Sequence, residues 1–121
     1  MLQGLRTVIY HAPDLAAAKA WYTAAFGVTP YFDEPFYVGF EIGGFELGLN
    51  PDTSGVNVGN NAVAYWGVAD IDDAYARLLD RGGRALDPVK DVGGDIRVAT
   101  IADPFGNVIG LIQNPHFSVK G

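Results

Sequence analysis

The sequence contains no cysteine, and this absence excludes several kinds of site at once. Without cysteine there is no disulfide framework, no thiolate metal site and no Cys nucleophile. Histidine is also scarce, because only His11 and His116 are present. These two histidines and the two serines, Ser54 and Ser118, are too scattered to predict a Ser–His–Asp triad.

Basic residues are few as well, with 8 Lys and Arg against 14 Asp and Glu and a net charge of −6. Such a surface repels phosphate backbones, so we do not expect a nucleic-acid partner. No apolar run approaches membrane-spanning length, and the N-terminus lacks a charged-then-apolar signal pattern. The sequence therefore predicts a cytoplasmic protein that does not act at a membrane.

What the chain does contain is typical of one globular domain spanning residues 1–121. Hydrophobic residues make up 49% of the sequence, which is enough for a core. Sixteen glycines and seven prolines indicate many turns and short strands.

The first half of the chain reads as strand, helix and hairpin. Residues 5–10 are predicted to form a strand, and Asp14 to cap a helix that Gly27 ends. Strands over 36–42 and 45–49 are joined at Gly43-Gly44, with a short edge strand over 31–36. Residues 51–61 are polar and rich in glycine and asparagine, which is typical of a linker.

The same pattern then begins again. Residues 63–68 form the next predicted strand, Asp70 caps a second helix, and Gly82-Gly83 ends it. The number of residues from Asp14 to Asp70 equals the number from Gly27 to Gly83. Asn114-Pro115 repeats Asn50-Pro51 at a wider spacing, so the second half holds extra residues, which we place in a loop over 87–95.

The second half ends in the turn Asp103-Pro104-Phe105-Gly106-Asn107, between predicted strands over 97–101 and 108–113. The chain is thus predicted to be α+β, with a βαβββ unit over 5–50, a linker over 51–61, a second βαβββ unit over 62–115 and a tail over 116–121. One helix covers only one face of each sheet. Two such units are therefore expected to form a curved mixed sheet around a shared cavity that binds a ligand.

These features resemble the vicinal oxygen chelate superfamily, which includes glyoxalase I, extradiol dioxygenases, and fosfomycin- and bleomycin-resistance proteins. The resemblance is carried by residues 8–27, by residues 66–83 and by the Asp-Pro-Phe-Gly-Asn turn. It implies the glyoxalase/bleomycin-resistance fold. It does not specify an activity, since the fold supports several chemistries as well as plain binding.

The resemblance also implies where a divalent metal would be held. The family positions fall on Thr7, Glu46, Val63 and Gly110. A metal needs about three ligands of the His, Glu, Asp or Gln type, and only Glu46 qualifies. We therefore expect no metal and no cofactor. Gly110, placed as the repeat counterpart of Glu46, is interpreted as a missing ligand that leaves extra room in the cavity.

Strand alternation and the resemblance together predict which side chains face the cavity. Phe36, Tyr37 and Phe40 are further candidates for its rim. The predicted ligand-binding residues are Thr7, Ile9, His11, Tyr37, Glu46, Val63, Tyr65, Val98, Thr100 and Gly110.

Three functions remain open at this point. The first is a metal-free protein that binds a partly apolar small molecule, as a homodimer. The second is a glyoxalase-like lyase, isomerase or dioxygenase with unconventional ligands such as Glu46, His11 and a partner's His116. The third is a metal-free enzyme in which Glu46, as a lone buried carboxylate with a raised pKa, is the catalytic general base. Alternatively, Glu46 is simply the partner of Arg97, Arg6, Thr7 or Tyr65.

Overall fold

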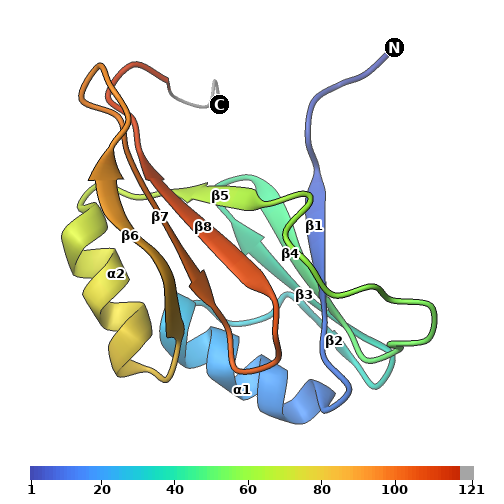
Figure 1. Cartoon of the computed structure of the whole chain (residues 1–121). Helices are drawn as coiled ribbons and strands as arrows, with labels where there is room; N and C mark the ends of the chain where they lie inside the picture. Colours follow the sequence, from blue (N-terminus) through green and yellow to red (C-terminus); the bar gives the residue numbers. More distant parts are fainter. Residues whose placement is uncertain (118–121) are drawn as a thin grey trace. The chain divides into compact units, whose positions relative to one another are not determined.

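The computed structural model describes residues 1–117, and the last four residues are not described. The chain divides into two compact units, Met1–Asn57 and Val58–Gly121. The helices and strands (Figure 1) follow in this order: β1 (Thr7–His11), α1 (Leu15–Phe26), β2 (Phe32–Glu34), β3 (Tyr37–Ile42), β4 (Phe45–Asn50), β5 (Ala64–Gly67), α2 (Ile71–Asp80), β6 (Arg84–Asp91), β7 (Arg97–Ala102) and β8 (Val108–Gln113). The predicted α+β class and its repeated unit are confirmed. No helix of the described part is long and apolar enough to cross a membrane.

The first unit is a four-stranded sheet with one covered face. Its strand order is β1-β4-β3-β2, in which β1 and β4 run parallel and the other pairs are antiparallel. Helix α1 contacts β3 and β4. The buried core holds Tyr22 of α1 and, from the sheet, Val38, Phe40, Leu47 and Leu49. The opposite sheet face, which carries Thr7, Ile9 and Glu46, is not covered by that helix.

Helix α1 begins and ends where the sequence predicts. The Asp14 side chain accepts a hydrogen bond from the Ala17 backbone N–H at 3.0 Å, which satisfies a donor that has no partner within the helix. Gly27 adopts a left-handed conformation with φ of 68°, and its N–H donates to the Thr23 carbonyl. Both helix ends are therefore set by local chemistry.

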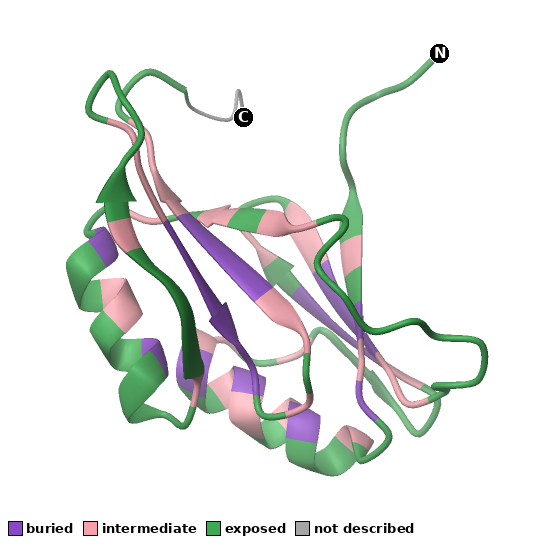
Figure 2. Cartoon of the chain, viewed as in Figure 1, coloured by how far each residue is buried: buried purple, intermediate pink, exposed green. Residues whose placement is uncertain are grey.

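The second unit repeats this architecture, with strand order β5-β8-β7-β6. Asp70 caps α2 through a hydrogen bond from the Asp73 backbone N–H. Helix α2 contacts β6, β7 and β8, and it buries Ile71 and Leu78. Figure 2 shows the buried second half of β7 and the buried middle of β8 beside the mostly exposed strand β6.

The turn between β7 and β8 is built around a buried carboxylate. Asp103 is only 4% exposed, and its Oδ1 accepts from the backbone N–H groups of Phe105 and Asn107, both at 2.8 Å. Its Oδ2 accepts from Asn107 Nδ2, also at 2.8 Å. Gly106 has a φ of 93°, a conformation that glycine adopts at little cost. These hydrogen bonds stabilise the tight turn that connects β7 to β8, the two central strands of the sheet.

The loop predicted over 87–95 is wrong, because most of it is strand. Strand β6 continues to Asp91, and only the short segment over 92–96 connects it to β7. Pro88 lies in this strand, where it is tolerated because β6 is at the sheet edge. Two register shifts against β7, between Ala85 and Asp87 and between Asp87 and Lys90, take up residues that the first unit lacks.

Candidate functional site

The candidate site is centred on the Glu46 carboxylate on the open face of the first unit. Glu46 lies directly opposite Thr7 of β1 and Glu41 of β3. Its Oε1 accepts from Thr7 Oγ1 at 2.7 Å and from the Tyr37 hydroxyl at 2.8 Å. Its Oε2 accepts from the Tyr31 hydroxyl. Three neutral hydroxyl groups from separate segments thus converge on one carboxylate.

Two glycines provide the room for this cluster. A β-carbon at Gly48 would overlap the Tyr37 hydroxyl, so the tyrosine ring lies across the bare backbone of β4. A β-carbon at Gly39 would lie 2.9 Å from Glu46 Oε2 and 3.2 Å from Tyr31 Cε1. The arrangement of the tyrosines therefore depends on the absence of side chains at Gly39 and Gly48.

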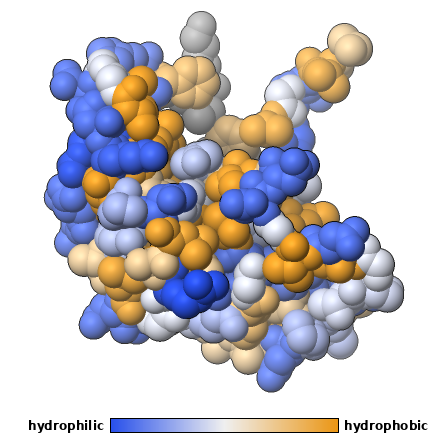
Figure 3. All heavy atoms as spheres, in the orientation of Figure 1, coloured by the Kyte–Doolittle hydropathy of each residue, from blue (hydrophilic) through white to orange (hydrophobic). Residues whose placement is uncertain are grey.

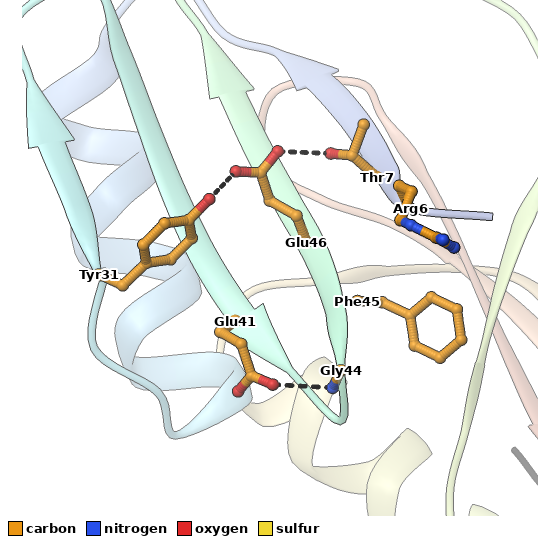
Figure 4. A pocket seen from close by; sticks show the side chains of 7 residues that line it. All are labelled: Arg6, Thr7, Tyr31, Glu41, Gly44, Phe45 and Glu46. Carbon is orange, nitrogen blue, oxygen red and sulfur yellow. Dashed lines mark hydrogen bonds between the residues drawn. The ribbon is translucent and has the colours of Figure 1, made fainter. Parts of the chain in front are cut away.

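A pocket of about 620 Å³ opens beside the carboxylate (Figure 4). It is lined by residues of the first unit only, namely Arg6, Thr7, Tyr31, Glu41, Gly44, Phe45 and Glu46. Its size is typical of sites that take a small organic molecule. Aromatic rings and a few polar groups line it together, which suits a ligand that is flat and partly apolar.

The hydroxyl groups determine how the site is charged. The hydrogen bond from Tyr31 is the main reason that the pKa of Glu46 lies below its ordinary value, and Thr7 and Tyr37 add to the effect. The predicted lone carboxylate with a raised pKa is therefore wrong, because burial alone would raise the pKa but the three donors outweigh it. Among the proposed partners of Glu46, Thr7 is the one found. Burial, with the bond to Glu46, raises the pKa of Tyr37 to about 12.

The other predicted residues of the first unit have separate roles. Ile9 lies on the same open face and is 44% exposed. His11 ends β1, and its Nδ1 lies 3.0 Å from the Asp52 carbonyl oxygen. Phe40 was predicted at a cavity rim, but it is fully buried under α1. Its side chain and that of Tyr37 point to opposite faces of the sheet, because the two residues are an odd number of positions apart in β3. Phe36 is exposed in the turn before β3.

In the second unit, Gly110 does not leave extra room. A β-carbon at Gly110 would lie 2.6 Å from Tyr65 Cδ1 and 2.8 Å from the Ala64 carbonyl oxygen. The Tyr65 ring therefore covers the glycine, although this tyrosine is itself 48% exposed. The predicted empty space is wrong, because a ring from the neighbouring strand fills it.

The pairing of the strands also changes the counterpart of Gly110. Gly110 lies opposite Tyr65, whereas Gly48 lies opposite Ile9. Ile9 and Tyr65 are equivalent in the repeat, because they are as far apart in the sequence as the two helix caps, Asp14 and Asp70. By strand pairing Gly110 thus corresponds to Gly48 rather than to Glu46, and both glycines are covered by a tyrosine ring. Strand pairing and the sequence repeat therefore give Gly110 different counterparts in β4, Gly48 by pairing and Glu46 by the repeat.

The remaining predicted residues lie elsewhere in the second unit. Thr100 is buried, and its hydroxyl donates to Asp87 Oδ2 at 2.7 Å. Val98 lies opposite Ile112, and Val63 immediately precedes β5. Arg97 is paired with Asp72 at 2.8 Å rather than with Glu46. On the face drawn in Figure 3, orange hydrophobic residues reach the surface among blue hydrophilic ones.

The donor set does not fit a divalent metal of the family type. The four family positions fall on Thr7, Glu46, Val63 and Gly110, and Glu46 is the only carboxylate among them. It already accepts hydrogen bonds from three hydroxyl groups. His11 is at the far end of β1 from Thr7, about 13 Å away, and His116 Nε2 lies 2.6 Å from the Gly94 carbonyl oxygen. No group of three His, Cys, Asp or Glu residues in the described part could hold a metal.

Sequence reasoning did not assign Tyr31 to the site. Tyr31 is 64% exposed, and it lies in the segment between α1 and β2. Its backbone N–H donates to the Gly39 carbonyl at 2.9 Å, which brings the ring over Glu46. The one signal available was the presence of Tyr31 at the start of the predicted edge strand over 31–36 and of Tyr37 directly after it.

Comparisons with known proteins agree on the family. A model described as the Glyoxalase/Bleomycin resistance protein/Dioxygenase superfamily matches residues 4–111. The protein named "Putative glyoxylase CFP32" from Mycobacterium bovis is 30% identical over an alignment of 109 residues that covers 83% of this chain and 41% of that protein. Its namesake from Mycobacterium tuberculosis matches equally. The chain thus spans about two-fifths of the length of these relatives.

Several solved structures have the same fold. A glyoxalase-related enzyme from Fulvimarina pelagi has a TM-score of 0.78 and 23% identity, with 98% of this chain and 94% of that chain covered. A lactoylglutathione lyase from Agrobacterium tumefaciens has a TM-score of 0.77 and 19% identity, with 99% and 100% covered. The fosfomycin resistance protein FosX from Listeria monocytogenes has a TM-score of 0.78 and 18% identity, with 96% and 97% covered.

Proposed function

Because the chain belongs to the Glyoxalase/Bleomycin resistance protein/Dioxygenase superfamily, we propose that it binds a small, partly apolar molecule at Glu46 without a metal ion. The observation that carries this proposal is the convergence of three hydroxyl groups on one carboxylate at the wall of a pocket. These bonds fix the orientation of the carboxylate before a ligand arrives. Preorganised polar groups of this kind give a binding site its specificity.

The protonation of Glu46 favours binding over proton abstraction. A general base works best when its pKa lies near the working pH. The hydroxyl groups instead move the pKa of Glu46 below its ordinary value, which makes the carboxylate a weaker base. At neutral pH it is a fixed negative charge, and such a charge recognises a hydrogen-bond donor.

The pocket lining supports the same proposal. Phe45 and the ring of Tyr31 provide flat apolar surface, and Thr7 and Glu46 provide polar contacts. The metal chemistry seen elsewhere in the family would need donors at Val63 and Gly110, which have none.

A thermal-shift screen of flat aromatic compounds tests this function. A ligand at about ten times its dissociation constant is expected to raise the melting temperature by about 5 °C, because it stabilises only the folded state. Glu46→Gln is expected to abolish the shift, whereas Glu34→Gln, an exposed carboxylate outside the pocket lining, is expected to preserve it. The proposal fails if no compound stabilises the protein, or if every stabilising compound acts equally on Glu46→Gln.

A further inference from the structure

The negative charge of Glu46 has no cationic partner among the described residues. Lys19 pairs with Asp33 and Arg97 pairs with Asp72, and neither ion pair includes Glu46. Arg6 lines the same pocket, but its guanidinium donates to carbonyl groups of residues 3–5 and to the Gln3 side chain. Figure 4 shows this side chain directed away from the carboxylate. Neutral hydroxyl groups alone therefore hold the Glu46 charge.

The two oxygens of the carboxylate are not equivalent. Oε1 accepts two hydrogen bonds, from Thr7 and Tyr37, which belong to strands β1 and β3. Oε2 accepts one, from Tyr31, which precedes β2. Oε1 is hard to free, because its two donors lie on strands that both pair with β4, whereas Oε2 depends on a single donor outside the strands.

The Tyr31 side chain can leave at small cost. Because it is 64% exposed, its hydroxyl can exchange the bond to Glu46 for bonds to water. Its backbone stays anchored by the hydrogen bond to the Gly39 carbonyl, so a side-chain rotation is enough. Tyr37, in contrast, is half-buried and lies across Gly48.

Resting on the proposed function, we infer that the ligand is a protonated nitrogen base on a flat ring, and that its N–H group replaces the Tyr31 hydroxyl at Glu46 Oε2. A charged donor forms a stronger bond to a carboxylate than a neutral hydroxyl does. The exchange therefore compensates the Glu46 charge and returns Tyr31 to water. The ring of Phe45 remains beside the pocket, where an aromatic face attracts a cation.

Titration with benzamidinium, benzamide and benzoate, followed by amide NMR shifts of the full chain, tests this inference. These probes share one ring and differ in charge. Benzamidinium is expected to bind with the highest affinity and benzoate with the lowest. Tyr31→Phe keeps the ring and removes only the competing hydroxyl, so it is expected to bind benzamidinium about fivefold more tightly. Tyr75→Phe, in α2 of the second unit, is the matched control and is expected to leave the affinity unchanged.

Other outcomes would overturn the inference. If Tyr31→Phe binds benzamidinium equally or more weakly, the hydroxyl is not displaced. If benzoate binds as tightly as benzamidinium, or if benzamidinium does not shift the amides near Glu46, the ligand is not a cation. In each case the proposed function still stands if neutral aromatic compounds bind in a manner that depends on Glu46, and it fails with the inference if none does.

Discussion

Asp103→Ala is expected to lower the free energy of unfolding by about 3 kcal/mol. The substitution removes an acceptor that is 4% exposed and that binds three donors of the turn. Those donors would remain in a partly buried turn without an equivalent partner. Because this turn joins β7 and β8, we expect the second unit to unfold more readily. Urea denaturation followed by tryptophan fluorescence measures the loss.

Asp91→Ala is the matched control for this substitution. Asp91 also accepts from a turn N–H, that of Gly93 at 2.7 Å, but it is exposed. Water can replace that bond, so a loss of about 0.5 kcal/mol is expected. Equal losses for the two variants would show that the buried carboxylate of Asp103 has no special role in the turn.

Gly110→Ala is expected to destabilise the protein by about 2 kcal/mol, the cost of inserting an atom into a filled site. The new β-carbon would lie 2.6 Å from Tyr65 Cδ1 and 2.8 Å from the Ala64 carbonyl oxygen. The tyrosine ring can rotate away, but the carbonyl belongs to the neighbouring strand backbone and cannot move without disturbing the pairing of β5 with β8. Denaturation curves of the variant and the original protein measure the difference.

Gly67→Ala is the control substitution, for which we do not expect a loss of stability. Gly67 is a strand glycine near the end of the same ladder, and a β-carbon there would meet nothing within 4 Å. Alanine at such a place restricts the unfolded chain, so it is expected to leave stability unchanged or raise it by about 0.5 kcal/mol. Gly110→Ala with equally little cost would contradict the covering of Gly110 by Tyr65.

Much of the fold could be predicted because its signals are local. A helix cap such as Asp14 acts on an N–H one turn away, and the Asp103 turn is built from consecutive residues. The equal spacing of the two helix caps and of the two helix ends then indicated two similar units. The strand β6 was missed because Pro88 resembles a loop residue, and only its place at the sheet edge makes it compatible with a strand.

The site was predicted less well than the fold, because it depends on contacts between distant residues. Glu46 and Thr7 were both named in advance, but they are far apart in the sequence and their pairing depends on strand register. Tyr31 lies in a loop before β2, and the path of a loop cannot be predicted from hydrophobic periodicity, so its contact with Glu46 was not expected. The presence of these hydroxyl groups reverses the expected pKa shift, which shows that burial alone is a poor guide to the protonation of a carboxylate.

The same contacts determine how the protein responds to acid. The pKa of Glu46 is lower in the folded protein than its ordinary value of 4.5, which serves as the unfolded reference. The carboxylate therefore contributes stability above the unfolded pKa, and this contribution is lost as the pH falls through the folded pKa.

The most direct test of this account is an NMR titration of the Glu46 side-chain carboxyl carbon in the folded protein. We predict a pKa below the ordinary glutamate value in the original protein, and a higher pKa in both Tyr31→Phe and Tyr37→Phe, because each variant removes one hydroxyl donor. A pKa above the ordinary value in the original protein would contradict the account and favour Glu46 as a general base.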